Sequence, residues 1–396
     1  MELKFPKGFY WGCATSSHQI EGNNQNNDWW EAEQAGKVPH KSANACDSYN
    51  LYETDFDLAK DMANNAHRFS LEWSRVEPEE GEFSEKEIEH YKNVVRALRE
   101  RGLEPFVTLH HFTNPVWFSK QGGWENSKAP FYFKRYAEYV AKNLPEVKYW
   151  ITINEPLVMA GKGYAEGAWP PFKKNKAGFL KTVRNLYRAH NAAYSALKRN
   201  KKDLQIGIAK NNNYVEAYQN RILSKIFAGF IDYVWNKWFL NKINKHQDFV
   251  GINYYNHNRI HVRLSHPKNW MNQNENKIVS DFGWELYPEG IYHVVRQASS
   301  YKKPIYIFEN GIADATDRFR PDFIKEHLTW LHKAIEEGAD VRGYFHWSLL
   351  DNFEWAEGYR MKFGLVEINF ETLERKSRGS FYKYKEICES NKLENE

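Results

Sequence analysis

The stretch PIYIFENGIA at residues 304–313 places apolar and aromatic residues directly before a carboxylate, an amide and a glycine. YWITINEPLV at residues 149–158 repeats this arrangement, because its β-branched run ends at Asn154 and Glu155. Strands that are buried on both faces read as short apolar runs without polar alternation. Two core strands that end in a carboxylate are typical of a barrel whose strand ends carry the chemistry.

Further runs of this kind recur along the whole chain. Together they cover residues 9–14, 66–71, 104–109, 149–154, 205–209, 249–254, 305–309 and 341–347. Helix-like amphipathic stretches lie between them, at 85–101, 130–144, 177–199, 288–301 and 321–338. Apolar strands that alternate with helices indicate a parallel sheet covered by helices on its outer side. We therefore predict an α/β protein with a single (β/α)8 TIM barrel, one domain over residues 1–396.

The composition is that of a soluble globular protein. Hydrophobic residues make up 42% and charged residues 27% of the chain, and no apolar run reaches the roughly 20 residues of a membrane span. The 55 basic and 51 acidic residues are closely mixed, so we expect no nucleic-acid partner. The N-terminal stretch lacks the apolar segment of a secretory signal, which predicts a cytoplasmic location. The oligomeric state stays open.

Three cysteines, Cys13, Cys46 and Cys388, have no paired spacing, which argues against a disulfide framework or a zinc site. His110 and His111 are the remaining candidates for a metal-dependent hydrolase. Adjacent residues at a strand end point to opposite sides, so this pair is a poor chelate. We expect neither a metal nor a cofactor.

The active site of such a barrel lies at the carboxyl ends of its strands. The candidates there are Gln19 and Glu21, Arg68, His110 and His111, Asn154 and Glu155, Asn253 and Tyr255, Glu309, and Trp347 with Glu354 and Trp355. Splitting a glycosidic bond needs one carboxylic acid to protonate the leaving oxygen and one carboxylate to attack or to activate water. Glu155 follows the fourth run and Glu309 ends the seventh, so both can face one central pocket.

The motifs around these residues resemble those of family 1 glycoside hydrolases, the retaining β-glucosidases and β-glycosidases. The likeness runs from end to end, through FYWGCATSSHQIEG (9–22), HRFSLEWSRVEP (67–78), TLHHFTNPVWF (108–118), TINEP (152–156), DFVGINYY (248–255), IFENG (307–311) and GYFHWSLLDNFEWAEGY (343–359). The resemblance implies double-displacement hydrolysis of terminal β-D-glucosyl residues from small β-glycosides, through a covalent glycosyl-enzyme intermediate. β-Galactosyl and β-fucosyl residues are candidate substrates as well.

The resemblance also assigns roles to the candidate residues. It implies Glu155 as the acid/base and Glu309 as the nucleophile. The sugar would be bound by Gln19, His111, Asn154, Tyr255, Trp347, Glu354, Trp355 and Phe363, with Trp347 beneath the ring. Arg68 and Asn253 would support the site. Paired with Arg68, Glu309 should stay ionised, and its charge should raise the pKa of Glu155 so that Glu155 begins protonated.

Some positions depart from the family pattern. They are Phe112, where many members have Trp, His18, where Tyr or Phe is common, and Phe308, where Thr often precedes the nucleophile. The region 211–248 looks shortened, and loops at this face build the site for the aglycone. An apolar entrance that favours aryl or alkyl β-glycosides could be lined by Phe112, Trp117, Phe118 and Trp169.

Two alternatives to a β-glucosidase stay open. One is a non-catalytic sugar-binding barrel, although the presence of both glutamates argues against it. The other is a 6-phospho-β-glucosidase, for which Arg360 and Lys362 supply positive charge near the sugar site. In the phospho-specific branch of the family, the position of Trp355 typically holds a small polar residue, and a Lys and a Tyr follow. Here an indole occupies that position, and Phe363 stands where the tyrosine would help.

Overall fold

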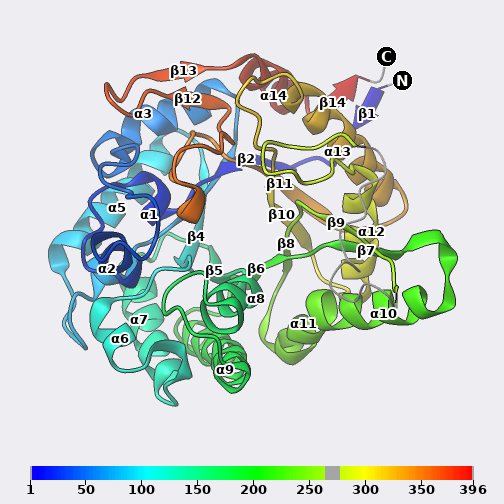
Figure 1. Cartoon of the computed structure of the whole chain (residues 1–396). Coiled ribbons are helices and arrows are strands. Elements are labelled where there is room, and N and C mark those ends of the chain that lie inside the picture. Colours follow the sequence, from blue (N-terminus) through cyan, green and yellow to red (C-terminus); the bar gives the residue numbers. More distant parts are fainter. Residues whose placement is uncertain (1, 264–276, 395–396) are drawn as a thin grey trace.

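In the computed structural model, which describes residues 2–263 and 277–394, eight parallel strands close into a barrel (Figure 1). The strands are β2 (Tyr10–Ala14), β3 (Ala66–Ser70), β4 (Glu104–His110), β5 (Tyr149–Asn154), β6 (Gln205–Asn211), β8 (Val250–Asn253), β10 (Ile305–Asn310) and β11 (Val341–Trp347). Around the ring they follow the order β10-β11-β2-β3-β4-β5-β6-β8. The predicted (β/α)8 barrel is confirmed, and each strand boundary lies within two residues of its expected place.

Helices cover the outer side of the barrel (Figure 1). The five predicted ones are α5 (Glu85–Glu100), α7 (Ala129–Asn143), α9 (Lys176–Asn200), α12 (Glu289–Ala298) and α13 (Arg320–Glu336). Local chemistry explains their starts: the Ser84 hydroxyl accepts a hydrogen bond from the Glu87 backbone amide at the beginning of α5. The structure adds α3 (Ser48–Asp61) and α14 (Gly379–Ser390).

Short elements complete the fold. The helices among them are α1 (Ser17–Ile20), α2 (Asp28–Gln34), α4 (Trp73–Val76), α6 (Val116–Lys120) and α8 (Pro156–Ala160). Antiparallel pairs form between β1 (Glu2–Lys4) and β14 (Lys392–Glu394) and between β12 (Val366–Ile368) and β13 (Arg375–Ser377). Between β6 and β8 lie β7 (Tyr214–Ala217), α10 (Ile222–Asp232) and α11 (Trp238–Ile243), and β7 pairs with β9 (His257–Ile260). No described helix is long and apolar enough to cross a membrane.

The inside of the barrel is filled by aromatic side chains rather than open to solvent. Phe106 stacks on Tyr149 with ring centroids 4.2 Å apart, and Phe308 lies parallel to Tyr306 at 5.6 Å. Gly251 makes room for Phe308, because a Cβ there would lie 2.4 Å from the Phe308 ring. Chemistry is therefore confined to the mouth of the barrel, above this packed layer.

Candidate active site

The two candidate catalytic carboxylates lie at the ends of strands three positions apart around the ring, as predicted. Glu309 is the penultimate residue of β10, and Glu155 directly follows β5. Both side chains are buried. Glu155 adopts the left-handed backbone region, with φ 44°, before Pro156 begins α8. A non-glycine residue in this region is uncommon, and such residues cluster at functional sites.

Glu309 is held by a cation and a phenol. Arg68 lies fully buried on β3 and donates to Glu309 Oε1 at 2.5 Å. The Tyr255 hydroxyl donates to Glu309 Oε2 at 2.9 Å. Both contacts stabilise the ionised carboxylate. The expected pairing of Arg68 with Glu309 is confirmed.

Glu155 has a different set of partners, which consists of neutral amides. Asn253 Nδ2 donates to Glu155 Oε1 at 2.9 Å, and Asn211 Nδ2 donates to the same oxygen at 3.0 Å. Asn211 was not among the sequence candidates, because the apolar run of its strand breaks at Lys210. The strand continues for two residues beyond its predicted end, through the polar Lys210 to Asn211.

Lys210 is a second residue that the sequence did not point to. Its side chain is fully buried beside the ring of Trp235, with Nζ 5.0 Å from the ring centroid, and it donates to the backbone oxygen of Asn211. Burial lowers the pKa of Lys210 to about 7, although the charge of Glu155 opposes this shift. An ammonium group close to the carboxylate of Glu155 is therefore available to tune its proton affinity.

Burial raises the pKa of each carboxyl group at the site. It does so for Glu155, and it brings the pKa of Glu309 to about 7 against the opposing charge of Arg68, with the charge of Glu155 adding to the rise. Burial and the charge of Glu309 raise the pKa of Glu354 to about 8. Arg68 and Tyr255 lower the pKa of Glu309 but do not cancel the effect of burial, because one arginine faces three coupled carboxyl groups.

The other predicted sugar-binding residues converge on the same mouth. Gln19 Nε2 donates to Glu354 Oε2 at 3.1 Å, although the two residues are 335 positions apart in the chain. Asn154 Oδ1 accepts from Arg68 at 2.7 Å, and Asn154 Nδ2 donates to His111 Nε2 at 3.2 Å. Burial and Arg68 lower the pKa of His111 far below its ordinary value, so it is neutral at physiological pH.

Aromatic planes flank these polar groups. The ring of His111 lies nearly parallel to Trp347 at 5.9 Å and to Trp355 at 6.2 Å. Phe363 is buried in the same cluster as Trp347, with its ring 6.2 Å from Tyr255. The structure thus brings together polar groups that can bind hydroxyls and flat faces that can cover the apolar sides of a pyranose.

A family model described as Glycosyl hydrolase family 1 matches residues 1–243 and 239–393. The chain belongs to glycosyl hydrolase family 1. Its fold and the positions of its two glutamates agree with the resemblance noted in the sequence.

Individual family 1 relatives carry different names. The solved β-glycosidase from Pyrococcus horikoshii is 40% identical, with a TM-score of 0.94 over 100% of this chain and 97% of that one. β-Glucosidase A from Thermotoga maritima is 33% identical over 99% of both chains. A 6-phospho-β-galactosidase from Staphylococcus epidermidis is 31% identical over 99% of this chain and 100% of its own. Family membership alone therefore does not choose the sugar.

Two of the departures from the family 1 pattern surround Trp355. His18 stacks on the Trp355 indole at 5.7 Å, accepts from Asn27 at Nδ1 and lies 3.2 Å from Glu33 through Nε2. Phe112 packs against the edge of Trp355 at 5.2 Å. Both substitutions keep a flat ring against the indole, so the aromatic wall is preserved with other residues.

The four aromatic residues predicted to line an apolar entrance separate into two groups. Phe112 and Trp169 contact each other at 5.1 Å, and Trp169 lies 5.8 Å from Trp355. In contrast, Trp117 and Phe118 are buried on α6, where they pack with Trp73. The short helix turns these two side chains into the protein interior, so they do not belong to the entrance.

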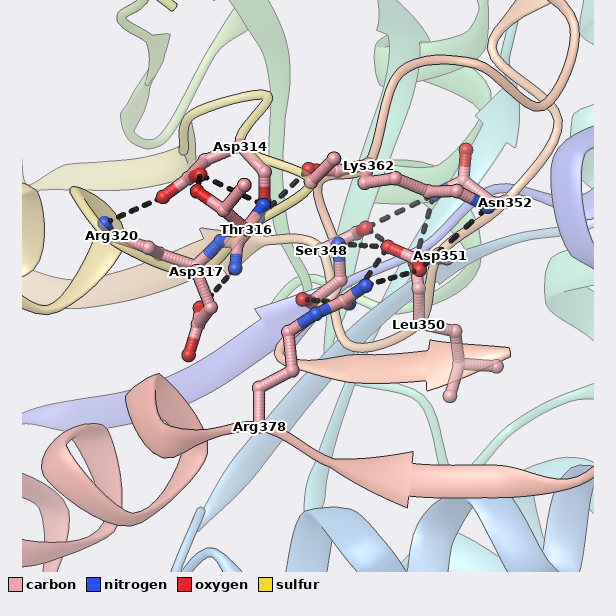
Figure 2. A network of polar contacts seen from close by, with 12 residues as sticks. Asp314, Thr316, Asp317, Arg320, Ser348, Leu350, Asp351, Asn352, Lys362 and Arg378 are labelled. Atoms are coloured by element: carbon pink, nitrogen blue, oxygen red, sulfur yellow. Dashed lines mark hydrogen bonds and ion pairs between the residues drawn. The ribbon is translucent and has the colours of Figure 1, made fainter. Parts of the chain in front are cut away.

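The loop after β11, which carries Glu354 and Trp355, is anchored by a separate cluster of charges (Figure 2). Arg378 donates to both oxygens of Asp351, at 3.0 and 2.8 Å, and both residues are buried. Lys362 Nζ lies 3.9 Å from the same carboxylate. These contacts tie Asp351, three residues before Glu354, to the start of α14, and they hold the loop in place.

His110 and His111 point to opposite sides of β4, as predicted. His110 Nε2 lies 3.0 Å from Asn114 Oδ1 and packs against Trp124, whereas His111 contacts Asn154 at the mouth. Within residues 2–263 and 277–394, no group of three or more His, Cys, Asp or Glu side chains is placed to hold a metal ion.

Proposed function

We propose that this chain hydrolyses terminal β-D-glucosyl residues from small β-glycosides with retention of configuration, and that residues 1–396 act as one barrel domain. The observation that carries this proposal is the unequal environment of two buried glutamates. Glu309 faces a guanidinium and a phenol, whereas Glu155 faces the neutral amides of Asn253 and Asn211. Two carboxyl groups with different environments can take different roles.

Glu309 is the nucleophile in this proposal, and Glu155 is the acid/base. Arg68 and Tyr255 favour the anion at Glu309, so the proton that the two carboxyl groups share resides on Glu155. In the first step Glu155 gives its proton to the glycosidic oxygen while an oxygen of Glu309 attacks the anomeric carbon. The bond to the aglycone breaks, and a glycosyl ester of Glu309 forms.

The second step reverses the role of Glu155. Once Glu309 is a neutral ester, its charge no longer raises the pKa of Glu155, so Glu155 can remain ionised and accept a proton from water. The resulting hydroxide oxygen attacks the anomeric carbon, the ester bond breaks, and Glu309 leaves as a carboxylate paired with Arg68. Two inversions give net retention.

The glycone is proposed to be oriented by the paired side chains of Gln19 and Glu354, which can each bridge two neighbouring hydroxyls. Asn154 stands beside the acid and can donate to the 2-hydroxyl, a contact that strengthens in an oxocarbenium-like transition state. Trp347 and Trp355 would cover the apolar faces of the ring.

A 6-phospho substrate is the second candidate, and the contacts of its proposed ligands argue against it. Arg360 is paired with Glu357 at the surface, and Lys362 points toward Asp351 and the ring of Phe370. The neighbouring Met361 and Phe363 are the side chains that join the apolar cluster of Trp347. A phosphate dianion requires donors that reach it. Lys362 lies between two residues that join the Trp347 cluster, and its own ammonium group points toward Asp351 and Phe370 instead.

The test is a panel of p-nitrophenyl β-glycosides that includes the glucoside, galactoside, fucoside, mannoside and 6-phosphoglucoside. We expect the highest kcat/KM on the glucoside, and NMR of the first product should show the β-anomer. A higher kcat/KM on the 6-phosphoglucoside would overturn the sugar assignment, an α-anomer would overturn retention, and binding without turnover of any substrate would indicate a sugar-binding barrel. The cytoplasmic location also stays a proposal, and cell fractionation tests it.

A further inference from the structure

Helix α10 (Ile222–Asp232) exposes its apolar side and buries its small residues, which is the reverse of an ordinary surface helix. The outward residues, which we name the apolar ridge, are Ile222, Leu223, Ile226 and Phe230 with Tyr233 and Val234 of the next turn. Their exposed fractions run from 42% at Val234 to 76% at Ile222. Ser224 and Ala228 are the side chains of α10 that are buried.

The ridge forms one continuous stripe. Positions 222, 226, 230 and 233 recur at the spacing that places side chains in one row on a helix. The helix lies at the periphery of the molecule, where it packs mainly against β7 and β9 (Figure 1). Contiguous apolar surface of this kind marks an interaction site, whereas single exposed residues such as Phe131 on α7 and Leu180 on α9 are ordinary.

Polar contacts on the inner side fix the rotation of α10. The Ser224 hydroxyl accepts from the Val262 backbone amide at 3.2 Å. At the other end, Asp232 Oδ1 accepts from Asn236 at 2.8 Å and from Gln297 at 2.9 Å. Rolling the ridge inward would break these contacts and bury a carboxylate, so the outward position of the apolar residues is built into the fold.

The charge around the ridge is one-sided. Residues 221–245 contain five basic residues, Arg221, Lys225, Lys237, Lys242 and Lys245, and one acidic residue, Asp232, which pairs with Lys237 at 3.0 Å. Since the whole chain has 55 basic and 51 acidic residues, this segment accounts for the entire net charge of +4. Arg221 and Lys225 are exposed on α10 itself or directly before it.

We propose that the apolar ridge docks on an anionic lipid surface, with α10 lying in the plane of the headgroups. An apolar stripe flanked by Lys and Arg is the pattern of helices that lie in a membrane interface, where acyl chains take the apolar side and acidic headgroups the basic side. A second copy of the chain fits less well. A two-fold contact through the ridge would bring together two copies of a segment that has five basic residues and one acidic residue, Asp232, which is already paired with Lys237.

Flotation with large unilamellar vesicles tests this docking. Wild-type protein should float with vesicles of phosphatidylcholine mixed with phosphatidylglycerol, bind pure phosphatidylcholine much more weakly, and be released by high salt. Ile226→Ser/Phe230→Ser should weaken binding at least about tenfold, because it removes buried apolar surface. Arg221→Gln/Lys225→Gln should weaken binding to the anionic vesicles by about fivefold for each charge removed.

Phe131→Ser/Leu180→Ser is the matched control, since it removes two equally exposed apolar side chains outside the ridge. This variant should bind vesicles as the wild type does. All three variants should keep their melting temperature and their turnover of a water-soluble aryl glucoside, because none of the altered residues lies in the candidate active site. Equal binding by the ridge variant and the control would overturn the proposal, as would no binding by the wild type. A wild-type dimer in sedimentation that Ile226→Ser/Phe230→Ser converts to a monomer, without vesicle binding, would assign the ridge to a second copy.

Discussion

Two clusters of charged side chains contact the loop after β11, and they differ in the ratio of acidic to basic groups. In the cluster of Figure 2, the carboxylates of Asp317 and Asp351 contact three basic side chains, Arg320, Lys362 and Arg378, and the Asp314 carboxylate accepts from the backbone amides of Phe319 and Arg320. At the candidate active site, Glu155, Glu309 and Glu354 have one directly contacting cation, Arg68, among the described residues.

The difference shows in the proton affinities. Although burial acts against it, hydrogen bonds and Arg320 lower the pKa of Asp314, whereas the pKa of Glu309 rises to about 7 and that of Glu354 to about 8. The cluster whose carboxylates are matched by basic side chains keeps a loop in place. The cluster with more carboxyl groups than cations retains protons that can be transferred near neutral pH.

The largest effect on turnover is expected at the candidate active site. Glu309→Ala should lower kcat by at least about 10⁴-fold, because the covalent intermediate cannot form. Its melting temperature should not fall, since the substitution also removes a carboxylate that is repelled by Glu155. Glu357→Ala, which removes a partly exposed carboxylate of the same loop, is the control and should keep full activity. Substantial turnover by Glu309→Ala would assign the nucleophile elsewhere.

Glu155→Ala should show a loss that depends on the leaving group. On alkyl glycosides, whose leaving oxygen needs a proton, we expect kcat to fall by about 10²–10⁴-fold. On a p-nitrophenyl glycoside the first step should survive, and azide should restore turnover and give a β-glycosyl azide. The basic limb of the pH–rate profile should disappear with the acid. A basic limb that persists in Glu155→Ala would mean that another group, with Lys210 the first suspect, donates the proton.

In the cluster around Asp351, removal of one ion-pair partner should lower the free energy of unfolding more than it lowers turnover. Arg378→Met leaves Asp351 buried without its bidentate partner, which costs about 3–5 kcal/mol in the free energy of unfolding. Urea denaturation measures this loss. In protein that remains folded, KM should rise more than kcat falls, because the loop carries Glu354 and Trp355. A variant as stable as the wild type would show that the cluster does not hold the loop.

The barrel and most of the site could be predicted because they depend on local patterns. Apolar runs located all eight strands, and the motifs at their ends located Glu155, Glu309 and their partners. Asn211 and Lys210 could not be found, because a buried lysine in a strand depends on contacts with distant segments, here Trp235 and Glu155, that the sequence does not show. Trp117 and Phe118 were misplaced for a related reason, since the sequence does not show which way a short helix turns its side chains.

Helix α10 shows the same limit for a whole element. Amphipathic periodicity reveals that one side of a helix is apolar, and the usual inference is that this side faces the core. Here Ser224 and Asp232 make the inner contacts, so the periodic side faces outward. Only the tertiary partners of the polar residues decide the direction.

The smallest expected effect is an opposite response of the two clusters to pH. The folded pKa of Glu309 is raised to about 7 from the ordinary 4.5, so the folded protein retains a proton that the unfolded chain releases between these values. The free energy of unfolding therefore falls as pH rises through this window. The folded pKa of Asp314 is lowered from the ordinary 3.8, so Asp314 contributes stability above that value, and the contribution is lost as pH falls below it.

We therefore expect Glu309→Gln to gain stability relative to the wild type between about pH 5 and pH 8, by on the order of 1 kcal/mol. Asp314→Asn should behave in the opposite sense: it should be less stable than the wild type at neutral pH, and the difference should shrink as the pH falls below the ordinary pKa of an aspartate. Urea denaturation of both variants at several pH values measures the two trends. If Glu309→Gln and the wild type lose stability in parallel from pH 5 to pH 8, then Glu309 is ionised throughout this range, and the imbalance of charge at the site must be met by protons on Glu155 and Glu354 alone.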